Sequence, residues 1–154
     1  MSDIVPCVGL NRAKDTLIVK DAHGQWSYTL KTQDATHTLT SYIYDTHTLL
    51  SAGYHWRDAN AHMAGTLLCL DLKSRSVRWC RYLTRDDADV YFNQLAHADG
   101  KIYCMGYLLD DTLTYRSFMT TWNSYGELLQ EKTLLERKIP RLRSHLGRRD
   151  DCAE

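Results

Sequence analysis

Short runs of apolar and β-branched residues follow one another along the whole chain, and turn residues bound each run. The runs are roughly five to eight residues long and rich in Thr, Tyr, Val, Leu and Ile, as β-strands are. Turn segments such as Asp21-Ala22-His23-Gly24 and Ala98-Asp99-Gly100-Lys101 separate them. Pro6 and Pro140 lie near the two ends, so the middle of the chain can form strand pairs without interruption. The pattern predicts an all-β protein.

The same pattern returns about every fifty residues, a spacing typical of stacked repeats. Residues 16–19 (TLIV) recur as residues 66–69 (TLLC), and residues 52–58 recur as residues 105–111. Overlaying the copies predicts a four-strand unit that occurs twice in full, after a partial unit without its first strand. The predicted strands are 4–10, 16–21 and 25–30, then 39–44, 48–54, 65–70 and 77–83, then 90–97, 101–108, 116–122 and 127–133.

One predicted hairpin, with Ser74 and Arg75 at its tip, can be worked out residue by residue. Side chains alternate between the two faces of a strand, so the register decides which residues share a face. Both faces of this hairpin carry apolar side chains, which predicts that its sheet is covered on both sides, as in stacked sheets. The expected cross-strand pairs are Leu72 with Val77, Leu70 with Trp79, Leu68 with Arg81 and Cys69 with Cys80.

Two segments resemble a known repeat. Residues 102–107 (IYCMGY), a polar stretch and residues 117–134 are similar to the bacterial bulk β-propeller repeats, in which I-Y-V-x-G-Y, a variable loop, an apolar strand, a glycine turn and a short strand follow in order. The earlier copy (LLSAGY at 49–54, LLCLDL at 67–72, VRW at 77–79) also resembles the quinoprotein-like blade. The resemblance implies antiparallel, four-stranded propeller-type blades, about three in this chain. It says little about function, because propeller folds host enzymes, lectins and scaffolds.

Three blades leave two sheet faces without a neighbour, whereas known propellers use about 4–8 blades. Each repeat buries its apolar face only against the next one, so the end faces need a partner. We therefore expect the chain to assemble with itself, for example as a homodimer that forms a six-bladed ring, or to dock onto another protein. Two sheets packed as a sandwich within one chain are a further alternative.

We expect one β-blade domain over residues 1–136 and a basic C-terminal segment over residues 137–154. That segment carries six Lys and Arg residues before its first acidic residue, Asp150. Residues 137–146 can be overlaid on residues 91–100 as an extra first strand, and a flexible tail is the alternative.

Charge and cysteine content narrow the function classes. The 154 residues include 19 basic and 19 acidic ones, so no net field attracts nucleic acid or an anionic membrane. No apolar run approaches the roughly 20 residues of a membrane span, and the N-terminus has no signal-peptide pattern. Five cysteines without a CxxC spacing indicate neither a disulfide framework nor a zinc site. We expect a cytoplasmic protein, in which Cys69 and Cys80 are free thiols and a cross-strand disulfide is the alternative.

Aromatic and polar residues in one loop are the best candidates for a binding site. Trp56, Arg57 and Asp58 lie in the polar loop 55–64, and the corresponding loop of the next copy carries Asp110 and Asp111. An exposed Trp beside charged groups suits stacking on, and hydrogen bonding to, a sugar or peptide. The alternative interpretation is that Trp56 folds back over its own blade. The other three tryptophans are expected in the core: Trp26, Trp79 and Trp122.

Candidate catalytic groups are less distinctive. The chain contains no HxH, HExxH, GxSxG or GxGxxG motif, and its acidic run at Asp86, Asp87 and Asp89 lacks the glycine spacing of a calcium loop. Four histidines crowd one region and suggest either a metal or proton-transfer site or polar loop residues: His37, His47, His55 and His62. We expect no metal and no cofactor.

The sequence thus favours a non-catalytic binding or interaction module. A lectin assembled from several chains is one alternative, and a metal-dependent enzyme that uses the His-rich loop is another. The expected partner is a second copy or another protein, with carbohydrate as a further option. Neither nucleic acid nor a membrane is expected.

Overall fold

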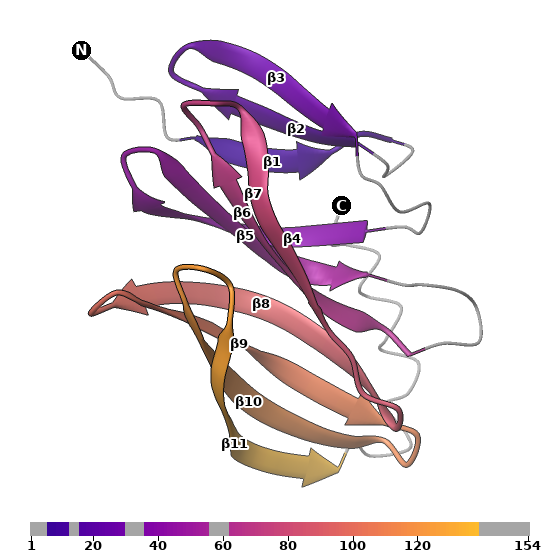
Figure 1. The fold of residues 1–154 in the computed structure, drawn as a ribbon. Helices are drawn as coiled ribbons and strands as arrows, with labels where there is room; N and C mark the ends of the chain where they lie inside the picture. Colours follow the sequence, from indigo (N-terminus) through magenta and orange to yellow (C-terminus); the bar gives the residue numbers. More distant parts are fainter. Residues whose placement is uncertain (1–5, 13–15, 30–35, 56–61, 139–154) are drawn as a thin grey trace.

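The computed structural model describes residues 6–12, 16–29, 36–55 and 62–138 (Figure 1). This part of the chain forms eleven strands and no helix, so it contains no helix able to cross a membrane. Each strand overlaps one predicted from the sequence. The strands are β1 (Cys7–Leu10), β2 (Thr16–Asp21), β3 (Gly24–Thr29), β4 (Thr36–Asp45), β5 (Thr48–His55), β6 (Ala64–Asp71), β7 (Ser76–Leu83), β8 (Ala88–Ala98), β9 (Lys101–Asp110), β10 (Thr114–Asn123) and β11 (Leu128–Lys138).

The strands form three antiparallel sheets, each of which follows the order of the sequence. We name them the N-terminal sheet (β1-β2-β3), the central sheet (β4-β5-β6-β7) and the C-terminal sheet (β8-β9-β10-β11). Figure 1 shows the three sheets as stacked layers with the central sheet in the middle. The all-β prediction and the antiparallel sheets of three and four strands are confirmed. The described sheets do not close into a ring.

Two apolar cores lie between the three layers. The larger core joins the central and C-terminal sheets, and the smaller core joins the N-terminal and central sheets. The central sheet is therefore covered on both faces, as its two-sided apolar pattern predicted. The larger core contains Leu50, Ala52, Leu67, Cys69, Trp79, Leu83, Ala88, Val90, Phe92, Ile102, Cys104, Leu108, Phe118 and Trp122. The smaller core contains Leu17, Val19, Trp26, Leu49, Leu68 and Leu70.

The three described tryptophans are buried, as expected. Each indole N–H has an acceptor: Trp26 donates to the carboxylate of Asp21 at 3.1 Å, and Trp122 donates to the hydroxyl of Thr120 at 2.8 Å. Buried polar atoms need such partners, because an unpaired buried donor costs about 1–3 kcal/mol. The third indole, Trp79, reaches from the central sheet to the C-terminal sheet.

Trp79 connects the two larger sheets. Its indole donates to the carbonyl of Ser124 at 3.0 Å, in the turn between β10 and β11. Arg81 donates to the carbonyl of Gly126 in the same turn at 2.8 Å, and its guanidinium carbon lies 5.3 Å from the centre of the Trp79 ring. Gly126 has a φ of +82°, and a Cβ atom there would lie 2.7 Å from the indole. Glycine is required at position 126, because the backbone there is left-handed and lies too close to the Trp79 ring to leave room for a side chain.

The predicted register of the β6–β7 hairpin is wrong. Asp71 pairs with Ser76 and Leu70 with Val77, and a bulge then brings Trp79 opposite Cys69. A two-residue tip requires a primed turn, for which Ser-Arg is poorly suited. The hairpin instead has a four-residue turn, in which the Asp71 carboxylate accepts hydrogen bonds from the amides of Lys73 and Ser74.

The bulge decides which residues share a face. Trp79 joins Cys69 in the larger core, whereas Cys80 packs against the smaller core on the other face. Cys69 lies opposite Trp79 and Cys80 lies opposite Leu68, so the predicted cross-strand pairing of the two cysteines is wrong. Both thiols are free, as expected. Burial raises the pKa of the Cys69 thiol to about 11.

The expected C-terminal segment, residues 137–154, begins inside β11, because that strand continues to Lys138. The remainder of the segment, including the overlay of residues 137–146 as an extra strand beyond Lys138, lies outside the described residues.

Candidate functional site

The sequence-predicted site lies where β9 ends. Trp56, Arg57 and Asp58 are outside the described residues, so the structure places only Asp110 and Asp111. Asp110 folds the turn that follows β9. One of its carboxylate oxygens accepts hydrogen bonds from the amides of Thr112 and Thr114 at 2.9 and 2.8 Å and from the Thr112 hydroxyl at 2.7 Å. Hydrogen bonding to Thr112 and the Thr114 amide holds the pKa of Asp110 below its usual range. These hydrogen bonds stabilise the turn between β9 and β10.

Asp111 is close to His62. The Nε2 atom of His62 lies 3.8 Å from the Asp111 carboxylate, whose side chain is 80% exposed. The Nδ1 atom of His62 lies 3.2 Å from Asp89, which also accepts a hydrogen bond from the Met63 amide at 2.6 Å. Asp89 therefore links the β5–β6 connection to the start of β8. Sequence reasoning placed Asp89 with the acidic run at Asp86 and missed this contact, which depends on the packing of two sheets.

The four histidines of the predicted His-rich region do not gather at one point. His47 lies in the turn before β5, whereas His55 ends β5 and packs against Tyr82, with ring centres 5.1 Å apart. His37 is in β4, where its backbone pairs with Tyr54. In the described ranges no group of three or more His, Cys, Asp or Glu residues can hold a metal ion.

A row of tyrosines crosses the C-terminal sheet near Asp89. The rings of Tyr91 and Tyr107 stack at 4.7 Å between centres, and those of Tyr107 and Tyr115 stack at 4.8 Å. Val90, Phe92 and Leu108, which adjoin Tyr91 and Tyr107 along the strands, belong to the larger core, so these two tyrosines extend from the other face of their strands. Tyr91 also contacts Tyr54 of β5, with ring centres 5.0 Å apart. Burial and the nearby Asp89 carboxylate raise the pKa of Tyr91 well above its usual range. This partly buried aromatic row was not predicted.

Exposed apolar residues gather on β11. Seven large hydrophobic side chains are exposed in the described part of the chain, and four of them belong to this strand. β11 is an edge strand, and among the described strands it pairs only with β10. The side chains and their exposed fractions are Leu128 at 39%, Leu129 at 52%, Leu134 at 51% and Leu135 at 50%.

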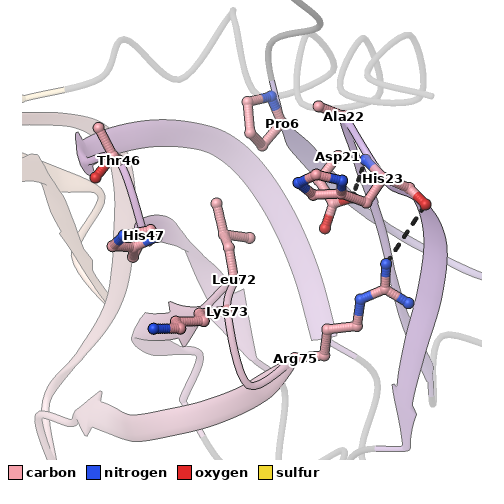
Figure 2. Close-up of a pocket in the computed structure, with 9 residues that line it drawn as sticks. All are labelled: Pro6, Asp21, Ala22, His23, Thr46, His47, Leu72, Lys73 and Arg75. Carbon is pink, nitrogen blue, oxygen red and sulfur yellow. Dashed lines mark hydrogen bonds between the residues drawn. The ribbon is translucent and has the colours of Figure 1, made fainter.

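A cavity of about 450 Å³ lies between turns of the N-terminal sheet and turns of the central sheet. We call it the turn pocket. The β2–β3, β4–β5 and β6–β7 turns surround it, and Pro6 completes its wall (Figure 2). In Figure 2, Leu72 projects between two pairs of side chains, His47 with Lys73 and His23 with Arg75. The residues that line the pocket are Pro6, Asp21, Ala22, His23, Thr46, His47, Leu72, Lys73 and Arg75.

Comparison with known proteins yields no relative: no family model matches the sequence, and no curated protein matches it. The antiparallel four-stranded sheets are compatible with propeller-type blades.

Proposed function

We propose that this protein is a non-catalytic interaction module, built from three propeller-type blades, that associates with a second copy of itself through β11. The exposed leucines of this edge strand carry the proposal. An unpaired edge presents a row of free N–H and C=O groups that can pair with another strand, and natural proteins usually protect such edges with charges, bulges or proline. β11 does carry charged residues and has two bulges, at Leu129 and Leu134, yet all four of its leucines are exposed.

The order of residues in β11 is self-complementary. Leu128 and Leu129 stand at one end of the polar stretch 130–133, and Leu134 and Leu135 stand at the other end. When two such strands pair antiparallel about their centres, each leucine pair of one copy lies opposite a leucine pair of the other. Edge pairing of this kind combines main-chain hydrogen bonds with apolar contacts. In a six-bladed ring the chains would contact each other through the faces of their sheets. The exposed leucines lie on an edge strand, and they therefore favour pairing of edges over formation of the ring.

The expected dimer is weak. Full burial of a leucine side chain contributes about 1.5–3 kcal/mol, and each leucine here is already about half buried, so eight of them contribute on the order of 6–12 kcal/mol. Association costs about 4–15 kcal/mol in lost freedom of motion. The two terms are of similar size, which indicates a dimer that dissociates on dilution.

Sedimentation equilibrium over a range of concentrations tests the proposal. The mass should rise from that of the 17.8 kDa chain toward twice this value. The double substitution Leu129→Ser and Leu135→Ser should keep the chain monomeric at every concentration. The matched control is Tyr125→Ser, which removes a 76% exposed ring from the turn before β11 and should leave the dimer intact. A wild-type chain that stays monomeric, or a leucine variant that dimerises like the wild type, would contradict the proposal.

Carbohydrate binding is a second candidate, favoured by the tyrosine row beside Asp89 and His62. Partly exposed aromatic rings next to carboxylates are suited to sugar recognition. A glycan array on the dimer should then give hits that Tyr115→Ala abolishes. An array without hits removes this candidate and leaves the proposed self-association untouched.

A further inference from the structure

We propose that the turn pocket binds a small organic anion, a molecule that carries a carboxylate or phosphate group on an apolar body. The proposal concerns a site that is separate from β11 and does not depend on self-association. It rests on the cavity itself, on the basic side chains around it, and on the way that three turns hold these side chains in place.

The three turns around the pocket share one sequence pattern, an aspartate followed two positions later by a basic residue. In each turn the Asp carboxylate accepts a hydrogen bond from the amide of that basic residue, which fixes the backbone from which the basic side chain extends. A site whose side chains start from fixed backbone loses less entropy on binding. The three bonds are His23 to Asp21 at 2.8 Å, His47 to Asp45 at 2.8 Å and Lys73 to Asp71 at 2.9 Å.

These hydrogen bonds also occupy the nearby carboxylates. Asp21 is the one acidic residue in the pocket lining, and it is buried, with its second oxygen accepting the N–H of Trp26. Asp71 forms an ion pair with Arg78 at 2.9 Å, outside the pocket lining. Asp45 lies beside the β4–β5 turn, also outside the lining, and one of its oxygens holds the His47 amide. The turn carboxylates are thus bound to turn amides, to Trp26 or to Arg78.

The two cationic side chains that line the pocket, Lys73 and Arg75, are not neutralised by these carboxylates. Lys73 and Arg75 are exposed, and across the described ranges neither of them belongs to an ion pair. Arg75 has one long hydrogen bond, 3.5 Å, to the carbonyl of His23. His23 and His47 add ring N–H donors on either side. An anionic group can accept hydrogen bonds from these side chains, and charge-assisted bonds of this kind are the stronger ones.

Leu72 and Pro6 give the same pocket an apolar wall. A cavity of about 450 Å³ lies within the range of small-molecule sites, which combine apolar lining with a few convergent polar groups. An inorganic ion would use the basic side chains alone. A ligand with an apolar body would also bury Leu72, and therefore we expect an organic anion to bind more tightly than inorganic phosphate.

Isothermal titration calorimetry with four probes tests the proposal: phenyl phosphate, benzoate, inorganic phosphate and benzyl alcohol. Phenyl phosphate or benzoate should bind with a Kd of about 1 mM or tighter at low ionic strength, and the tighter of the two identifies the preferred head group. Inorganic phosphate should bind less tightly, and uncharged benzyl alcohol should not bind. Added salt should weaken the binding of both organic anions, because the contact is partly exposed.

The variant for this test is Lys73→Gln with Arg75→Asn. Asn tolerates the left-handed backbone of Arg75, whose φ is +57°, so the turn is kept while both cations are removed. The double variant should weaken binding at least about tenfold. The control, Lys101→Gln, removes an exposed cation from the start of β9 in the C-terminal sheet and should leave the Kd unchanged.

A second measurement does not depend on the variant. The ring resonances of His23 and His47 in the wild-type chain should shift saturably as the bound anion is added. Three outcomes overturn the proposal: neither organic anion saturates the protein, benzyl alcohol binds as well as the anions, or the double variant binds like the wild type.

Discussion

Substitution of Gly126 by alanine tests the contact that joins the central and C-terminal sheets. Gly126 has a φ of +82°, and Gly100, in the β8–β9 turn, has a φ of +76°. Alanine in a left-handed conformation costs about 1–2 kcal/mol at either position. The surroundings differ: a Cβ atom at Gly100 meets nothing within 4 Å, whereas a Cβ atom at Gly126 would lie 2.7 Å from the Trp79 indole. The two glycines therefore separate backbone strain from a steric clash.

The clash adds to the strain because Trp79 cannot move freely. Trp79 is only 8% exposed, and its indole N–H is hydrogen bonded to the carbonyl of Ser124. Forcing extra volume into a packed site costs about 1–3 kcal/mol. We therefore expect Gly126→Ala to lower the free energy of unfolding by about 2–5 kcal/mol and Gly100→Ala by only about 1–2 kcal/mol.

Urea unfolding followed by circular dichroism measures both variants without relying on the fluorescence of Trp79. A third variant, Trp79→Leu, removes the clash, so Gly126→Ala in that background should cost no more than Gly100→Ala does in the wild type. Equal losses for Gly126→Ala and Gly100→Ala in the wild-type background would refute the reasoning and, with it, the packing of the β10–β11 turn on the central sheet.

Two further predictions concern ionisable groups. In a Cys152→Ser background, Cys7 of the native protein should react with a thiol reagent at pH 8. Cys69 should react only after unfolding, because burial raises its pKa to about 11. Rapid labelling of Cys69 in the native protein would contradict its place in the core. Asp110→Asn should destabilise the protein at neutral pH. Since the pKa of Asp110 is lowered on folding, its contribution is present above the unfolded-state pKa and is lost as the pH falls through the folded-state pKa, so the difference in urea midpoint between wild type and variant should shrink toward pH 3.

The strands were predictable because their signal is local. Alternating apolar residues and turn residues recur within each run, and every described strand overlaps a predicted one. The covering of both faces of the central sheet followed from the same pattern. The register of β6 and β7 was not predictable in this way. It depends on whether the turn has two or four residues, and the hydrogen bonds of Asp71 to Lys73 and Ser74 decide this.

The candidate site was harder to predict, because nearness in an antiparallel sheet differs from nearness along the chain. His47 and His55 are eight positions apart in the sequence, yet they lie at opposite ends of β5, because His47 precedes the strand and His55 is its last residue. Conversely, His62 and Asp89 are 27 positions apart and lie 3.2 Å from each other. The turn pocket has a signal in the sequence, the Asp-x-basic pattern of its three turns, but only the stacking of two sheets brings these turns together.

The two proposed surfaces lie in different sheets, and this separation has a consequence for how they act together. The turn pocket is lined by turns of the N-terminal and central sheets and by Pro6, whereas β11 is an edge of the C-terminal sheet among the described strands. A dimer formed through β11 therefore leaves both pockets open. Two sites influence each other only when binding at one changes the equilibrium at the other, and the coupling is then equal in both directions. No residue of the pocket lining belongs to β8, β9, β10 or β11, so an anion in the pocket meets the same surface in monomer and dimer. The two proposals therefore describe independent contacts, one to a small anion and one to a second copy, and we expect neither to change the affinity of the other.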